Sequence, residues 1–140
     1  MAYDLKRFVV AQHGVYDDVV AELRAGRKTS HWMWFVFPQV AGLGRSGMSQ
    51  QYAIRSLDEA RAYLAHPVLG PRLRECAGLV LATPARSAED IFGGIDAVKL
   101  RSSMTLFHRA DPGEPVFVEV LERFYGGVPD AATDRILGLA

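Results

Sequence analysis

The sequence is poor in the features that mark secreted and membrane-spanning proteins. Cys76 is the only cysteine among 140 residues, so no disulfide can form within the chain and a disulfide-held secreted domain is excluded. Apolar runs stay well short of the ~18–20 residues that cross a bilayer, and the first residues lack the hydrophobic stretch of a signal peptide. We therefore expect a cytoplasmic protein that does not enter a membrane.

The chain also lacks an excess of charge of either sign. Its 16 Lys+Arg balance 16 Asp+Glu, which gives a formal net charge of zero at pH 7. A neutral chain has no overall electrostatic attraction for nucleic acid, so we predict no nucleic-acid partner. Neither an HExxH nor a CxxC motif occurs, and we therefore expect no metal site and no cofactor.

What is present is helical periodicity. Apolar residues recur at i, i+3, i+4 and i+7 in residues 16–23 and again in residues 117–124, while hydrophobic residues make up 49% of the chain. Long runs of alternating polar and apolar residues, typical of strands, are missing. The pattern predicts an all-α fold, a compact single-domain bundle of about seven to nine short helices over residues 1–140.

Residues typical of helix ends support the same fold. Pro71 and Pro115 are each predicted to be the first residue of a helix, and Gly126 is placed to end a helix. The side chains predicted to cap helix N-termini are those of Ser56, Ser87, Asp96 and Asp130. We expect short connections between the helices.

Residues 30–39, with the sequence SHWMWFVFPQ, do not fit one periodicity. Their high content of aromatic residues suits a strand, but a single strand would have no partner in the chain. The segment is therefore predicted to form a short buried helix that ends before Pro38. The glycine-rich residues 40–48 that follow are expected to be a flexible connection.

The same segment holds the first candidate site. Both tryptophans, Trp32 and Trp34, stand beside Ser30 and His31. One interpretation is that these residues are the densest part of the core. The other is a pocket, because indole rings stack on planar ligands and a histidine can transfer a proton near neutral pH. Both interpretations stay open at the level of sequence.

The second candidate lies in residues 99–107, where Lys99, Ser102 and Ser103 fall within about one helical turn. Such serines often only bond back to the preceding turn, but beside a lysine they also suit an anionic ligand. Arg101 is a second residue that could hold an anionic group. A basic cluster of Arg24, Arg27 and Lys28 precedes Ser30 and is interpreted as a solvated helix C-terminus. The alternative is that it borders the aromatic pocket, where it would suit an anionic ligand.

With these segments described, the chain resembles the bacterial domain-of-unknown-function family 1810. The resemblance rests on residues 4–8 with Gln12, and on residues 30–39, 42–54, 60–73 and 91–107. It implies a mainly helical single domain without an assigned activity. Some members carry the label calpastatin, which implies a disordered inhibitor and does not suit this aromatic, helix-capped sequence.

A fainter similarity links the chain to a helical superfamily associated with NAD and ADP-ribose metabolism, and it implies nucleotide-like substrates without identifying a catalytic residue. We therefore predict a pocket for a small planar or anionic ligand, such as a nucleotide or an ADP-ribose derivative. Hydrolysis of that ligand stays open, with His31 as the candidate catalytic residue. The alternative is a helical protein–protein interaction module that uses the same aromatic surface. The predicted ligand-binding residues are Ser30, His31, Trp32, Trp34, Gln39, Lys99, Ser102 and Ser103.

Overall fold

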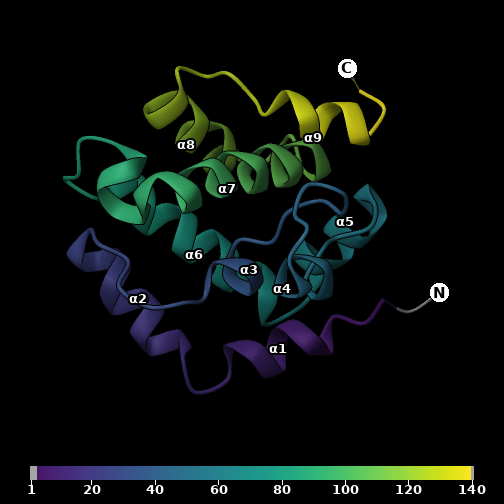
Figure 1. Cartoon of the computed structure of the whole chain (residues 1–140), viewed down its shortest axis with the longest axis horizontal. Coiled ribbons are helices and arrows are strands. Elements are labelled where there is room, and N and C mark those ends of the chain that lie inside the picture. Colours follow the sequence, from purple (N-terminus) through teal and green to yellow (C-terminus); the bar gives the residue numbers. More distant parts are fainter. Residues whose placement is uncertain (1–2, 140) are drawn as a thin grey trace.

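The computed structural model describes residues 3–139, and within them the chain folds into nine α-helices (Figure 1). The helices are α1 Lys6–Gln12, α2 Tyr16–Ala25, α3 Met33–Val36, α4 Gly47–Gln51, α5 Leu57–Ala65, α6 Leu69–Ala82, α7 Ala88–Ala110, α8 Pro115–Tyr125 and α9 Ala131–Ile136. The all-α prediction is confirmed. Within the same residues, no helix is both long and apolar enough to cross a membrane.

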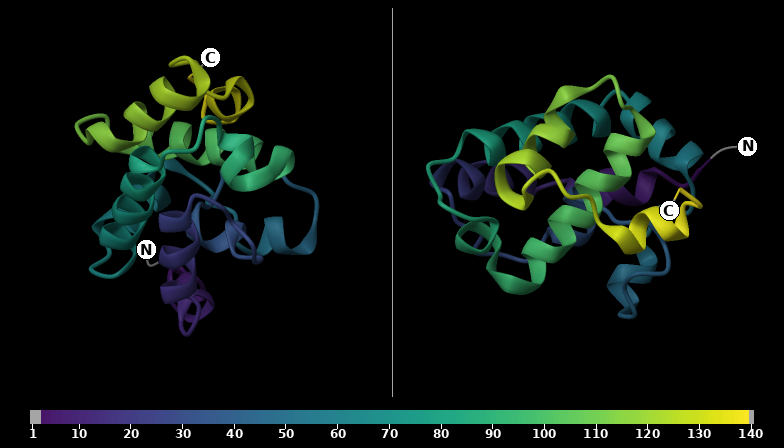
Figure 2. Two further views of the ribbon diagram at one scale, coloured as in Figure 1. Left: turned by 90° about the vertical axis from the view of Figure 1, so that its left-hand side faces the viewer. Right: turned by 90° about the horizontal axis from the view of Figure 1, so that it is seen from above.

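The long helix α7 is the centre of the architecture. It packs against α5, α8 and α9, while α6 packs against α8, α5 and α2. Two perpendicular views place α8 and α9 on one side of α7 and α1 and α2 on the other (Figure 1, Figure 2). Residues 102–107 of α7 are all buried, so this part of the helix is covered on every face.

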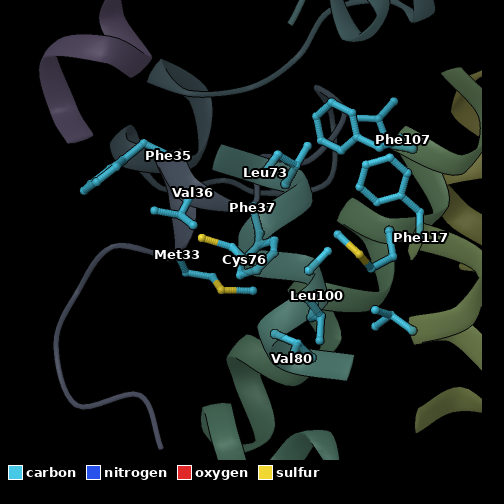
Figure 3. Close-up of a cluster of buried hydrophobic side chains, with 14 of the residues drawn as sticks. Met33, Phe35, Val36, Phe37, Leu73, Cys76, Val80, Leu100, Phe107 and Phe117 are labelled. Carbon is cyan, nitrogen blue, oxygen red and sulfur yellow. The ribbon is translucent and has the colours of Figure 1, made fainter. Parts of the chain in front are cut away.

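The core joins side chains from α3, α6, α7 and α8 in one cluster (Figure 3). Phe107 of α7 lies between two rings, with centroids 5.3 Å from Tyr63 of α5 and 5.9 Å from Phe117 of α8. Pairs of aromatic rings at such distances add to the stabilisation that comes from buried apolar area. The aromatic residues of three helices therefore fix how α5, α7 and α8 pack.

Several predicted helix ends are confirmed. The hydroxyl of Ser56 accepts a hydrogen bond from the Glu59 amide, and the side chains of Ser87 and Asp130 cap α7 and α9 in the same way. Helix α8 begins at Pro115 and is capped after Tyr125 by Gly126, whose φ of +63° is the left-handed conformation that favours glycine.

Two predicted boundaries are wrong. Asp96 does not begin a separate helix: α7 runs from Ala88 to Ala110, with its only non-helical backbone at Gly93, where φ is 78° and ψ is 169°. The Asp96 side chain pairs with two lysines instead of capping a helix. Helix α6 begins at Leu69, two residues before Pro71, because proline is compatible with the whole first turn of a helix.

The aromatic segment behaves as predicted. Within residues 30–39 the chain forms the four-residue helix α3, which ends before Pro38. The residues after this segment form a loop whose end contacts its start, since an isolated parallel bridge joins Val40 to Ile54. The Ala41 amide donates to the Ile54 carbonyl at 2.8 Å, and the Ile54 amide donates to the Gln39 carbonyl at 2.9 Å. These two bonds close residues 40–54 into a tied loop that contains α4.

Candidate functional site

The largest of the described pockets is a groove of about 460 Å³ between the tied loop, α7 and the start of α9. Four apolar residues and five others line it. They are Leu43, Ile95, Val98 and Ala132, together with Gln39, Gly44, Lys99, Ser102 and Asp130. Ligand pockets commonly measure about 300–1,000 Å³ and combine apolar walls with a few polar groups. The groove therefore has the size and lining of a small-molecule site.

The part of α7 that follows the kink at Gly93 supplies one wall of the groove. Ile95, Val98, Lys99 and Ser102 stand at i, i+3, i+4 and i+7, the spacing that places side chains on one face of a helix. The opposite face of the same helix carries Leu100 and other core residues. One helix thus contributes both to the core and to the groove.

A smaller chamber of about 10 Å³ adjoins the groove, and Gln39 and Lys99 line both. Its other walls are Met33, Trp34, Phe37, Ser49 and Tyr52. The Lys99 ammonium lies 5.1 Å from the centroid of the Trp34 ring, a cation–π contact. The indole N–H of Trp34 is buried and has no hydrogen-bond partner among residues 3–139. The chamber is about the size of one water molecule.

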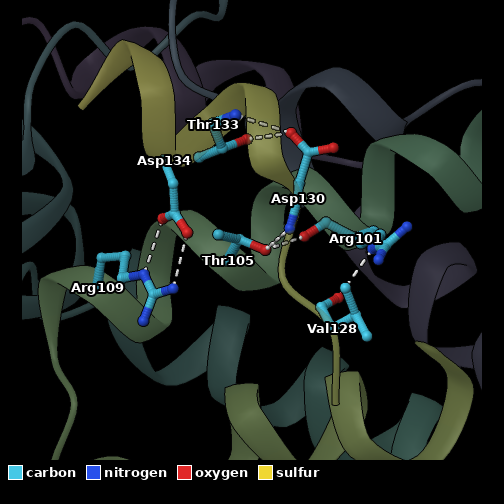
Figure 4. A network of polar contacts seen from close by, with 7 residues as sticks. All are labelled: Arg101, Thr105, Arg109, Val128, Asp130, Thr133 and Asp134. Atoms are coloured by element: carbon cyan, nitrogen blue, oxygen red, sulfur yellow. Dashed lines mark hydrogen bonds and ion pairs between the residues drawn. The ribbon is translucent and has the colours of Figure 1, made fainter. Parts of the chain in front are cut away.

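Asp130 reaches the groove through a polar network at the start of α9 (Figure 4). Its Oδ2 accepts hydrogen bonds from the amide of Thr133 at 2.9 Å and from the Thr133 hydroxyl at 2.7 Å. The Asp130 amide donates to the Thr105 hydroxyl, which in turn donates to the Arg101 carbonyl at 2.8 Å. These bonds fix the start of α9 against α7. One carboxylate oxygen of Asp130 takes no part in the cap.

The same network secures the rest of the C-terminal segment (Figure 4). Arg109 makes two 2.8 Å hydrogen bonds to the Asp134 carboxylate, and this pairing raises the pKa of the Arg109 guanidinium. Arg101 donates to the Val128 carbonyl at 2.9 Å, so this predicted anion-binding residue has a structural partner. Both arginines tie the segment after α8 to α7.

Of the predicted site residues, three line the groove (Gln39, Lys99 and Ser102) and a fourth, Trp34, lines the adjoining chamber. Trp34 and Gln39 come from residues 30–39, and Lys99 and Ser102 come from α7. The Ser102 hydroxyl donates to the Val98 carbonyl at 3.3 Å, the back-bond that is usual for a serine in a helix. Ser103 is fully buried, and its hydroxyl has no hydrogen-bond partner within the part of the chain that the structure describes.

Ser30 and Trp32 lie elsewhere, around the carboxylate of Glu22. The indole N–H of Trp32 donates to Glu22 Oε1 at 3.0 Å, and the Ser30 hydroxyl donates to Oε2 at 2.6 Å. The amides of Thr29 and Ser30 also donate to Oε1. Burial opposes ionisation of Glu22, but these hydrogen bonds outweigh it and lower its pKa to about 2. This arrangement anchors the chain between α2 and α3.

His31 stands apart from both groups. Its side chain is exposed, whereas the neighbouring Trp32 is only 1% exposed, and His31 is not among the residues that line the groove or the chamber. Among residues 3–139, no three His, Cys, Asp or Glu side chains gather in a geometry that could hold a metal ion. The chemistry offered by the groove is therefore that of a lysine, a carboxylate and neutral hydrogen-bonding groups.

Sequence reasoning missed several residues of the groove. Ile95 and Val98 are 78% and 62% exposed although they are apolar. Their i, i+3 spacing with Lys99 and Ser102 was a detectable signal, since it sets an apolar pair on the same face as the candidate polar residues. Leu43 and Asp130 carried no such signal, because only the folded chain brings the loop and α9 to α7.

Comparisons with known proteins place the chain among relatives. A sequence model described as protein of unknown function (DUF1810) matches residues 2–137. The fold is similar to the crystal structure of the conserved hypothetical protein Rv1873 from Mycobacterium tuberculosis, with 56% sequence identity, a TM-score of 0.96 and 99% of each chain covered. No curated protein matches the chain. The first similarity assigns the chain to a family of unknown function, and the second shows that it shares the fold of a solved structure.

Proposed function

The chain belongs to the DUF1810 family, as its sequence motifs predicted, and we propose that it binds a small molecule with an apolar or planar part and an anionic group. The observation that carries the proposal is the position of Lys99. Its ammonium lies on the wall of a groove of about 460 Å³ whose other walls are largely apolar. A cation fixed beside apolar surface selects ligands that combine both characters.

The lining supports a nucleotide-like ligand. A base or similar ring can pack on the apolar pair Ile95 and Val98, while Lys99 binds a phosphate or another anionic group. The free carboxylate oxygen of Asp130 can accept hydrogen bonds from ligand hydroxyl or amino groups. Gln39 offers both a donor and an acceptor. We propose Trp34, Gln39, Lys99 and Ser102 as the ligand contacts among the residues predicted from sequence.

The groups in the groove favour binding over hydrolysis. Ser102 donates its hydroxyl proton to a backbone carbonyl, and Asp130 uses one oxygen to cap α9. Lys99 is paired with Asp96 at 3.5 Å. None of these side chains forms the pair of nucleophile and general base on which covalent catalysis depends.

Thermal shift and calorimetry with matched ligands test the proposal. AMP, ADP-ribose and NAD are compared with adenosine, which lacks the anionic group, on the wild type and on Lys99→Met. A ligand at 100 times its Kd stabilises the fold by about 2.7 kcal/mol, so the wild type should melt several degrees higher with at least one anionic compound. Lys99→Met should abolish that shift. Lys6→Met, which removes an exposed charge from α1, is the matched control.

Two further outcomes are informative. Loss of binding in His31→Ala would mean that the ligand contacts the exposed histidine, and it would contradict the assignment of the site to the groove. Absence of a shift with every anionic compound, at concentrations up to the millimolar range, would contradict ligand binding of this class.

A second candidate function rests on the exposure of Ile95 and Val98, at 78% and 62%. Apolar side chains exposed together on one helix face suit a partner protein that covers them with an amphipathic helix. A photo-crosslinking residue at position 95 should then capture one defined partner in cells, while the same residue at position 6 should not. Absence of a crosslink specific to position 95 would contradict this function.

A further inference from the structure

Three charged side chains form a cluster behind the groove. The Asp96 carboxylate binds Lys28 through Oδ2 at 2.8 Å and Lys99 through Oδ1 at 3.5 Å. Each lysine also lies against a tryptophan, with Lys28 5.2 Å from the Trp32 ring and Lys99 5.1 Å from the Trp34 ring. The cluster therefore extends from the buried anchor of the aromatic segment to the wall of the groove.

The two lysines do not share the carboxylate equally. The Lys28 side chain is only 8% exposed and makes the shorter contact, whereas the Lys99 side chain is 22% exposed and makes the longer one. The Coulomb attraction between opposite charges increases as their separation shortens and as water is excluded. Lys28 therefore neutralises most of the charge of Asp96. The cluster has two positive charges and one negative charge, and the excess positive charge lies at Lys99.

We infer that Lys28, which does not line the groove, sets the net charge around Lys99 on the groove wall and so the preference of this wall for anionic ligands. By holding Asp96, Lys28 leaves Lys99 as a net cation beside Trp34. Asp130 also lines the groove but is not among the residues of the chamber around Trp34, so the cluster determines the charge next to that ring. The statement about ligands rests on the proposed function, whereas the statement about charge does not.

Substitutions in the cluster give opposite effects. In Lys28→Met, Asp96 has Lys99 as its remaining partner, and the net charge of the cluster falls from +1 to 0. In Asp96→Asn, the net charge rises to +2. The double variant Lys28→Met/Asp96→Asn returns it to +1, with Lys99 as the remaining cation. Lys28→Arg keeps the charge and serves as the conservative control.

The net charge around Lys99 can be measured without a natural ligand, by the quenching of tryptophan fluorescence with iodide. Trp32 is 1% exposed, so the accessible emission comes from the half-buried Trp34. Iodide should quench Lys28→Met about threefold to tenfold less efficiently than the wild type at constant ionic strength. Acrylamide, which is neutral, should quench both equally. The double variant and Lys28→Arg should match the wild type, and Trp34→Phe should remove the accessible emission.

The same variants are then titrated with AMP and adenosine. The inference is supported if Lys28→Met weakens AMP binding by the factor seen with iodide, leaves adenosine unaffected, and is rescued by Asp96→Asn. Equal iodide quenching in the wild type and Lys28→Met, or failure of the double variant to recover, would overturn it. If Lys28→Met does not fold, the test uses Asp96→Asn instead. Iodide should quench Asp96→Asn more efficiently than the wild type, and equal quenching would overturn the inference.

Failure of the proposed function gives a different result. In that case iodide quenching follows the cluster charge, but neither AMP nor adenosine binds any variant. That result would support the inference that Lys28 sets the charge around Lys99. It would contradict the proposal that the groove binds nucleotide-like ligands.

Discussion

Replacing Glu22 tests whether the aromatic segment has two separate roles, one as an anchor and one at the groove. Glu22→Ala removes the acceptor of four hydrogen bonds, including the one from the buried Trp32 indole. An unpaired buried donor costs about 1–3 kcal/mol, and hydrogen bonds to a charged group contribute more than neutral ones. We therefore expect a loss of about 3 kcal/mol in the free energy of unfolding and a Tm lower by roughly 10 °C.

The assay is thermal and urea unfolding, followed by circular dichroism, of single and double variants. The cost of Glu22→Ala should shrink by about 1–3 kcal/mol in a Trp32→Phe background, where no indole N–H is left unpaired. Because the folded pKa of Glu22 is lowered from 4.5 to about 2, its contribution is complete above pH 4.5 and is lost as the pH falls toward 2. The wild type and Glu22→Ala should thus converge in stability near pH 2.

Two results would refute this reasoning. A Tm of Glu22→Ala within about 2 °C of the wild type at pH 7 would mean that the four hydrogen bonds contribute little. An equal cost in the wild type and in the Trp32→Phe background would mean that Glu22 does not act through the indole.

Three further predictions concern the core and the edge of the groove. A Cβ at Gly70 would stand 2.0 Å from a backbone carbonyl oxygen of α5, so Gly70→Ala should lower stability by at least about 2 kcal/mol. Gly78→Ala, in the same helix with open space around it, should raise stability by about 0.5–1 kcal/mol; calorimetry compares the pair. Burial raises the pKa of the Cys76 thiol to about 12, so a thiol reagent should label the native protein far more slowly than the urea-unfolded one. Thr105→Val leaves the Asp130 amide without its acceptor and should lower the Tm by roughly 4–8 °C.

Local features of the fold could be predicted from sequence because their physical causes are local. The caps at Ser56, Ser87 and Asp130 depend on a side chain and an amide three residues away, and all three are present. Asp96 fitted the same pattern and failed, because Lys28 binds its carboxylate from a segment nearly seventy residues earlier in the sequence. A sequence pattern does not contain that contact.

The site was less predictable because it depends on which residues tertiary structure brings together. In the apolar pattern of residues 16–23, Glu22 lies off the apolar face of α2, yet the chain after α2 turns back and places Trp32 and Ser30 on its carboxylate. Residues two positions apart in one motif therefore lie in different parts of the structure. Trp32 belongs to the anchor around Glu22, and Trp34 lines the chamber. Periodicity predicts which face of a helix a residue lies on. It does not predict where neighbouring side chains lie when their segment has no regular repeat.

The covered stretch of α7 has a consequence for how the sequence can vary. Most helices keep a water-facing stripe on which substitutions accumulate freely, so tolerance to mutation rises and falls every three to four residues. Residues 102–107 have no such stripe, because all six are buried. A saturation mutagenesis library should therefore show an unbroken block of intolerance at residues 102–107, unlike the periodic tolerance expected of the other helices.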